Sequence, residues 1–329
     1  MAKIPELSDL FLAAADIEVE TPITVGVGKV DSNGRFLIPQ FAKAWTWTAW
    51  ADSFPIKEMM RLKFSLPTAD SAAEAILRFF GVPTPDAWQA SWGEFAVQYR
   101  QTQKFEINQL ALAAWVREAE LIAEQIPLEE FDEAKLMASL DELRQLTAGD
   151  VQEGLDRAQV ICASFGVALV VVPELPGTRI SGCARWLDDR HAMVGLTLRY
   201  KWADQLWFTF FHELAHILLH RTLHMFVIDN AAKYMGDDVV DSGMAKYEEE
   251  ADRFAADTLI PPDALAGFLR HAARGLTNEE YNAAVKDLAN SLGIGPGIVV
   301  GRLQHDKVLK PSQGTRLKQK LDWGFVTED

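Results

Sequence analysis

Residues 206–219 place two histidines and a glutamate inside an otherwise apolar run. Aromatic and aliphatic side chains precede and follow the three polar residues, as in a buried helix. His212 and His216 are four residues apart, so on a helix their rings lie one above the other on the same face. Two imidazoles in that arrangement can bind one metal ion. The segment therefore predicts a buried helix that carries a metal site.

Glu213 follows the first histidine directly and lies about 100° further round the helix, so it is not expected to be a ligand. From there it can reach a water held by the metal and accept its proton, which is the general-base role in the His-Glu-x-x-His motif of zinc hydrolases. Five-residue motifs also arise by chance, and a buried histidine commonly only bonds a carbonyl. A third ligand elsewhere in the chain is therefore required.

Composition narrows the class of protein. The chain has 329 residues, of which 49% are hydrophobic, enough to form real cores. Its net charge of −15 disfavours a general nucleic-acid binder. No secretory signal and no apolar stretch of membrane-spanning length is apparent, and the two cysteines, Cys162 and Cys183, do not form a Cys-x-x-Cys pair. We expect a cytoplasmic protein that does not enter a membrane.

The pattern along the chain predicts an α+β fold with a mainly helical N-terminal half. Residues 151–165 read as a helix, and apolar runs at 167–172, 180–187 and 192–198 read as short strands before the histidine helix. A small sheet backed by a metal-binding helix is the common layout of small zinc peptidases. The expected divisions are a variable region with a β-hairpin at 1–65, a helical domain at 66–150, a zinc metallopeptidase domain at 151–268 and a C-terminal helical module at 269–329.

A second helix, expected at 247–261, carries an acidic run beside its apolar stripe. Glu249 points away from the stripe and is expected to be solvated. Glu248 and Glu250 both lie on the flanks of the stripe, so periodicity alone does not choose between them as the third ligand. Asp252 is less favoured on the same grounds.

The pair of segments 211–220 and 250–261 resembles the ImmA/IrrE family of zinc metallopeptidases. The second segment matches the family pattern Glu-Ala-Asn/Asp-x-Phe-Ala followed by a Leu-hydrophobic-Pro ending. The resemblance covers roughly residues 70–325 and is most specific between 160 and 305. Two departures stand out: residues 1–65 show no helix-turn-helix pattern of the XRE type, and Ala215 replaces the glycine that often precedes the second histidine.

The resemblance implies a zincin-like peptidase core in which Zn²⁺ is bound by His212, His216 and Glu250 and Glu213 is the base. It also implies a protein substrate, a helix-turn-helix repressor or antitoxin that is cleaved under stress or in mobile elements. The alternative is a non-proteolytic regulator or antitoxin-like binding protein that uses the peptidase fold as a sensor or scaffold. A purely structural zinc domain would need a fourth protein ligand such as His220.

The sequence also suggests roles for residues around the expected metal site. His220 is expected to be solvated or to contact a ligand from outside rather than to bind the metal. Tyr247, Arg199 and Tyr200 are candidate oxyanion donors, and the sequence does not choose among them. The segment 180–185 is the expected sheet edge for an added substrate strand, with Gly182 as either a close-approach point or a bulge.

The C-terminal segment 283–305 reads as helix, glycine turn, helix, which resembles a helix-turn-helix unit. Its second helix is rich in Ile and Val and offers few side chains that could read bases. We therefore expect this module to serve packing or partner binding rather than DNA recognition.

Overall fold

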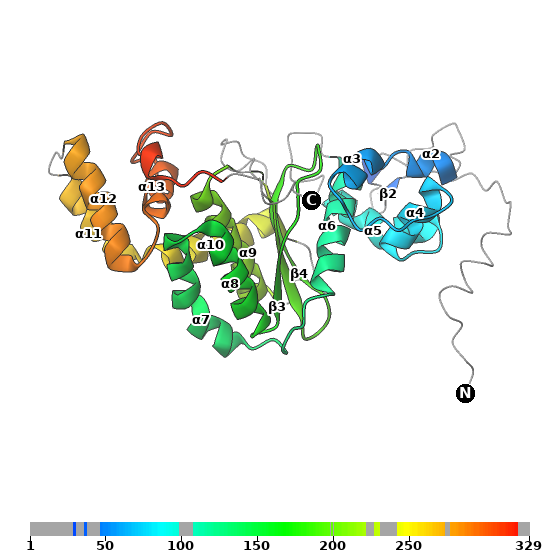
Figure 1. The fold of residues 1–329 in the computed structure, drawn as a ribbon, viewed down its shortest axis with the longest axis horizontal. Coiled ribbons are helices and arrows are strands. Elements are labelled where there is room, and N and C mark those ends of the chain that lie inside the picture. Colours follow the sequence, from blue (N-terminus) through cyan, green and yellow to red (C-terminus); the bar gives the residue numbers. More distant parts are fainter. Residues whose placement is uncertain are drawn as a thin grey trace. The chain divides into compact units, whose positions relative to one another are not determined.

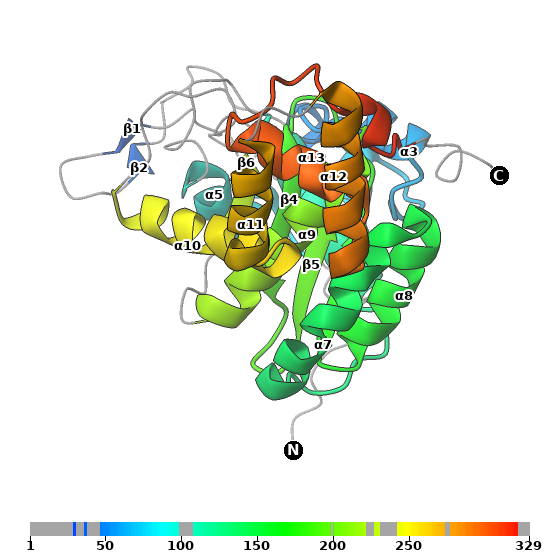
Figure 2. The same ribbon diagram turned by 90° about the vertical axis from the view of Figure 1, so that its left-hand side faces the viewer.

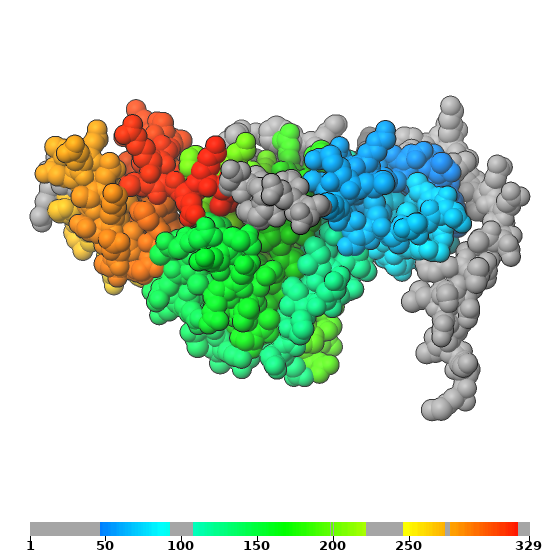
Figure 3. All heavy atoms as spheres, viewed as in Figure 1, coloured from blue at the N-terminus to red at the C-terminus, as the bar shows by residue number. Residues whose placement is uncertain are grey.

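The computed structural model describes nine segments of the chain, shown in Figures 1 and 3. They are residues 29–30, 36–37, 47–98, 108–197, 199, 201–221, 227–230, 242–273 and 277–321. The chain divides into two compact units, coloured mainly blue to cyan and mainly green to red in Figure 3. Unit 1 comprises Met1–Glu118 and Leu175–Thr178, and unit 2 comprises Ala119–Glu174 and Arg179–Asp329. The expected division into regions 1–65, 66–150, 151–268 and 269–329 stays a prediction.

Unit 1 is built from short helices around an aromatic core. Its helices are α2 (Trp47–Ala51), α3 (Ile56–Arg61), α4 (Ala72–Phe80), α5 (Pro85–Gln98) and the first part of α6 (Gln109–Ala123). Trp88 is 2% exposed and packs edge-on against Trp50, Phe54 and Phe80. The strands β1 (Lys29–Val30) and β2 (Phe36–Leu37) pair antiparallel.

Unit 2 contains the mixed sheet. After α7 (Glu133–Gln145), a 3-10 turn and α8 (Val151–Ala163) come β3 (Val167–Val171), β4 (Ile180–Trp186) and β5 (Ala192–Leu196). The described strands lie in the order β3-β5-β4-β6, where β6 is Val227–Asn230. The β3–β5 pair is parallel and the other two are antiparallel. The predicted α+β class, mostly helical with a small sheet, is confirmed.

One expectation about the sheet is wrong. Segment 180–185 was expected to be a free edge for substrate, but β4 is paired with β5 on one side and with β6 on the other. Its backbone groups are already used in both ladders, so a substrate strand has no place beside it. Among the described strands, β6 and β3 occupy the two edges.

Two helices cover one face of this sheet, as Figures 1 and 2 show. Helix α8 packs on β3, and α9 (Ala203–Leu219) packs on β4 and β5. Helix α10 (Ser242–Leu259) then packs along α9. The core between these layers contains large buried side chains, among them Trp207, Phe210 and Phe211 of α9. Burial of α9 on both sides explains its nearly continuous apolar sequence.

The C-terminal helices are α11 (Pro262–Ala272), α12 (Asn278–Leu292) and α13 (Pro296–His305). Thr277 and Glu280 form a capping box at the start of α12, and Gly293 ends it with a φ of 66°. Helix α13 buries Ile298, Val299, Val300 and Leu303. The expectation that this module serves packing or partner binding stays a prediction.

Beyond α13, residues 319–320 are hydrogen-bonded to the backbone at the start of α9. Trp202 and Lys320 form an antiparallel bridge, and the Ala203 amide donates to the Gln319 carbonyl at 3.0 Å. The N-terminal end of the histidine helix is therefore held by residues more than one hundred positions later in the chain.

No helix among the described segments is long and apolar enough to cross a membrane.

Candidate metal centre

Helix α9 brings the two histidines of the motif together in the interior. His212 is 1% exposed and His216 is 3% exposed. Their Nε2 atoms lie 3.0 Å apart, and the ring centroids are 4.7 Å apart. The four-residue spacing therefore produces the shared face expected from the sequence.

Helix α10 supplies a carboxylate to the same point. Glu248 places one oxygen 3.4 Å from Nε2 of His212 and the other 3.5 Å from Nε2 of His216. The three side chains form a group whose potential ligand atoms all lie within 4.8 Å of one another. Ligands about 2.0 Å from one tetrahedral ion lie about 3.3 Å from each other, so the observed separations fit a zinc-sized ion.

Glu250 is not part of this group. Its carboxylate lies 3.1 Å from Nε2 of His220 and 3.6 Å from Nζ of Lys246, and 39% of its side chain is exposed. The hydrogen bond from His220 holds the pKa of Glu250 below its usual value. The resemblance selected Glu250 as the third ligand, whereas in the structure Glu248 is the carboxylate that lies beside the Nε2 atoms of both histidines. Glu250 is two residues further along α10, which turns it about 200° away from Glu248.

Asp252 and His220 contact the histidine pair from outside. Asp252 places Oδ1 2.9 Å from Nδ1 of His212. His220 is 4% exposed, and its Nδ1 lies 2.9 Å from Nδ1 of His216. Of the two positions expected for His220, contact with a histidine of the motif from outside agrees with the structure, and a solvated side chain is wrong because His220 is buried.

Glu213 is completely buried between α9 and β4. Gly182 of β4 lies directly against it, because a Cβ at Gly182 would stand 2.9 Å from Cγ and Oε1 of Glu213. A Cβ there would also stand 2.7 Å from Cγ2 of Thr209. Gly182 therefore makes room for Glu213 and Thr209 on the helix. Both expectations for Gly182 agree with the structure, because helix α9 approaches it closely and the β4–β6 register shifts between Ile180 and Gly182 as at a β-bulge.

The described thiols are ordinary core groups. Cys162 and Cys183 are both buried. Burial raises the pKa of each thiol, and the charge of Glu213 raises the pKa of Cys183 further. Both remain protonated at neutral pH and add no ligand to the metal group.

The candidate oxyanion donors lie in different places. Tyr247 packs its ring edge-on against His220, with centroids 4.8 Å apart, and so borders the histidine column. Arg199 instead lies 4.0 Å from Glu174 and donates to the Arg179 carbonyl. Burial raises the pKa of Glu174, although Arg199 opposes that shift. Tyr200 lies outside the described residues.

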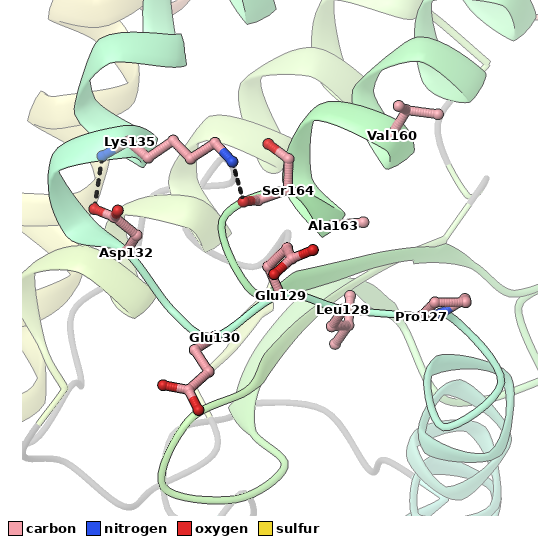
Figure 4. A pocket seen from close by; sticks show the side chains of 9 residues that line it. All are labelled: Pro127, Leu128, Glu129, Glu130, Asp132, Lys135, Val160, Ala163 and Ser164. Atoms are coloured by element: carbon pink, nitrogen blue, oxygen red, sulfur yellow. Dashed lines mark hydrogen bonds between the residues drawn. The ribbon is translucent and has the colours of Figure 1, made fainter.

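A surface pocket also occurs in unit 2, between the 127–132 segment, Lys135 and the end of α8 (Figure 4). Lys135 donates a hydrogen bond from Nζ to the Ser164 carbonyl at 2.6 Å, so its ammonium group already has a partner within the protein. None of the residues lining this pocket belongs to the histidine–carboxylate group. The pocket therefore adds nothing to the metal centre.

The contact between Asp252 and His212 is not among the sequence predictions, whereas the contact of His220 is. Asp252 follows Glu248 by four residues, the same spacing that relates His212 to His216. Two residues at that spacing on α10 can therefore face two residues at that spacing on α9. This shared four-residue spacing is the sequence feature that could have predicted the contact between Asp252 and His212.

Comparison with known proteins supports a peptidase assignment. Residues 198–304 match the family model of peptidase family M78, described as the IrrE N-terminal-like domain. The matched region contains α9, α10 and all three members of the histidine–carboxylate group. A search of curated proteins finds no match to the chain.

Proposed function

We propose that this chain is a zinc-dependent endopeptidase that cleaves one regulatory protein, because residues 198–304 match the IrrE-type model of peptidase family M78. The proposed substrate is a helix-turn-helix transcriptional repressor or an antitoxin. A peptidase domain implies a protein substrate, and the resemblance of the sequence to the ImmA/IrrE family supports this substrate class. The observation that carries the proposal is the convergence of His212, His216 and Glu248 at zinc-ligand separations.

The proposed ligands are His212, His216 and Glu248, with Glu248 replacing the Glu250 suggested by the resemblance. Two imidazoles and one carboxylate leave the fourth position of a tetrahedral ion open, as in catalytic rather than structural zinc sites. Mixed nitrogen and oxygen donors of this kind suit zinc. Glu213, Glu248 and Asp252 also bring negative charge into a largely buried region, and a divalent cation would balance it.

When bound, Zn²⁺ lowers the pKa of water and polarises a peptide carbonyl. Glu213 then serves as the general base, accepting the proton of the attacking water and passing it to the leaving amine. Its packing against Gly182 holds its carboxylate in a fixed place, which reduces the reorganisation that proton transfer requires. Burial of the histidines keeps their rings in one orientation and excludes competing water.

The proposal is tested with the full chain and a helix-turn-helix repressor encoded next to it. Zinc is counted in the purified protein, and repressor cleavage is followed during co-expression with wild type, Glu213→Gln and the exposed control Glu249→Gln. We expect one zinc per chain in all three, with cleavage by wild type and the control but not by Glu213→Gln.

Three results would contradict separate parts of the proposal. A wild-type chain without zinc would refute the metal site. Undiminished cleavage by Glu213→Gln would refute the assigned base. An intact repressor beside a zinc-loaded wild-type chain would refute the substrate class and favour the non-proteolytic regulator. For the ligands, Glu248→Ala should lose zinc while Glu250→Ala retains measurable binding.

A further inference from the structure

Helix α10 presents three acidic side chains toward the histidines of α9, and only one belongs to the metal group. Glu248 contacts the Nε2 atoms of both His212 and His216. The Asp252 carboxylate lies 2.9 Å from Nδ1 of His212, and the Glu250 carboxylate lies 3.1 Å from Nε2 of His220. These two carboxylates have no role in the proposed proton transfer, yet each lies at the end of a series of close contacts that begins at a proposed ligand.

We infer that Asp252, and Glu250 acting through His220, are positioning residues that orient His212 and His216 toward the metal. This inference rests on the metal site of the proposed function, but it does not depend on peptide cleavage. It assigns Glu250 a role different from the ligand role that the resemblance suggested.

The contact between Asp252 and His212 determines which nitrogen of His212 is free. Nε2 of His212 faces Glu248 and His216, whereas Nδ1 faces the Asp252 carboxylate. A negative carboxylate 2.9 Å from Nδ1 favours the tautomer of His212 in which Nδ1 carries the proton. Nε2 then keeps its lone pair for the metal.

His216 reaches its carboxylate through a second histidine. For Nε2 of His216 to bind a metal, its proton must be on Nδ1, which lies 2.9 Å from Nδ1 of His220. Nδ1 of His220 must then accept, so the proton of His220 is on Nε2, which donates to Glu250 at 3.1 Å. One assignment of protons therefore satisfies the whole chain of contacts and leaves the metal-facing atom free.

His220 is held firmly in this bridging position. Its side chain is 3% exposed, and the ring of Tyr247 packs edge-on against it. Its backbone amide donates to the His216 carbonyl at 3.1 Å at the end of α9. Because Nδ1 of His220 faces the outer nitrogen of His216, His220 stands behind that ligand rather than beside the metal-facing atoms. This position opposes its use as a fourth, structural ligand.

The test measures zinc affinity of the full chain by competition with a chromogenic chelator. Asp252→Ala and Glu250→Ala remove the acceptor, whereas Asp252→Asn and Glu250→Gln keep one acceptor oxygen, replace the other with an NH2 group and remove the charge. Glu249→Ala is the matched control, since Glu249 is on the same helix, is 71% exposed and pairs with Arg253. We expect each alanine variant at 250 and 252 to weaken zinc binding about 10- to 100-fold, the amide variants to restore most of it, and the control to be unchanged.

A double-mutant cycle tests the route through His220. In a His220→Phe background, Glu250→Ala should cause no further loss of zinc affinity, while Asp252→Ala should still cause its full loss. The visible spectrum of the Co²⁺-loaded chain should shift in the 250 and 252 alanine variants and not in Glu249→Ala. Thermal unfolding of the metal-free variants checks that they are folded, and Glu250→Ala changes only a partly exposed side chain.

Each outcome has a distinct meaning. If wild type binds no zinc, the proposed function fails. If wild type binds zinc and both alanine variants match the control, only the positioning role is refuted. If Glu250→Ala abolishes zinc binding while Glu248→Ala retains it, Glu250 is the ligand and the inference is overturned. Equal losses from Glu250→Ala with and without His220 would refute the bridging histidine.

Discussion

Glu213 lies against the backbone of Gly182, so closely that a Cβ on Gly182 would stand 2.9 Å from two of its side-chain atoms. Gly182 is on β4 inside the sheet, and Glu213 is on the helix that covers it. The proposed base is therefore positioned by the absence of a side chain on a neighbouring strand. This relationship connects the packing of the sheet with the proposed chemistry.

Gly182→Ala should damage activity without removing the metal. The new methyl group would overlap Glu213 and Thr209, and a displacement of about 1 Å at a catalytic group can cost about 100-fold in rate. We expect kcat/KM for repressor cleavage to fall about 10- to 100-fold, zinc content to stay at the wild-type level, and stability to fall by about 1–3 kcal/mol.

Gly267→Ala is the matched control for that substitution. Gly267 is in α11, and a Cβ there meets only Arg270 Nη2, at 3.9 Å. Wild-type activity is expected, with a stability gain of up to about 1 kcal/mol. Full activity in Gly182→Ala would show that Glu213 does not depend on this contact.

Lys318→Met should destabilise unit 2 in a pH-dependent way. Lys318 Nζ lies 2.8 Å from Asp204 Oδ2, and the two side chains are 7% and 6% exposed. Removing one partner of a buried pair commonly costs about 3–5 kcal/mol, because the other charge stays buried. The loss should appear in chemical unfolding at neutral pH, and Lys320→Met, at an exposed position, should show little change.

The direction in which pH changes the stability of Lys318→Met follows from the pKa of Asp204. Burial raises its pKa above the ordinary 3.8, and Lys318 opposes that shift. Without Lys318 the pKa rises further, so the folded state binds the proton more tightly than the unfolded state does. The instability of Lys318→Met should thus be greatest at neutral pH and decrease as the pH falls toward 4. A pH-independent loss would contradict this account.

Removing the metal should lower the stability of unit 2. A ligand that binds only the folded state stabilises it by about 4 kcal/mol at a thousandfold excess over Kd. We expect chelation to lower the thermal midpoint of the wild-type chain in calorimetry and zinc to restore it. Glu248→Ala should melt at the same temperature with and without zinc, whereas Glu249→Ala should respond as wild type does.

The C-terminal helices should not bind duplex DNA. The apolar side chains of α13 are buried, and Arg302 is paired with Asp306 at 2.8 Å. The net charge of −15 adds long-range repulsion from phosphates. Fluorescence anisotropy with labelled duplex at low salt should detect no saturable binding. Salt-sensitive binding that Arg302→Ala weakens would contradict this expectation.

Local patterns predicted much of unit 2. The predicted strands correspond to β3, β4 and β5, and the predicted histidine helix corresponds to α9. These elements are recognisable because apolar runs bounded by glycine, proline and charged residues leave few alternatives. The pairing of β4 with β6 was not predictable in the same way, since it joins segments that are far apart in sequence.

The motif alone determined that His212 and His216 share a helix face, because helical periodicity is a local property of the backbone. Only the tertiary structure distinguishes the positions of Glu248 and Glu250. Both lie near the buried stripe of α10, and only the way α10 packs on α9 turns one toward the Nε2 atoms and the other toward His220. Periodicity describes a single helix, whereas a ligand set depends on how two helices face each other.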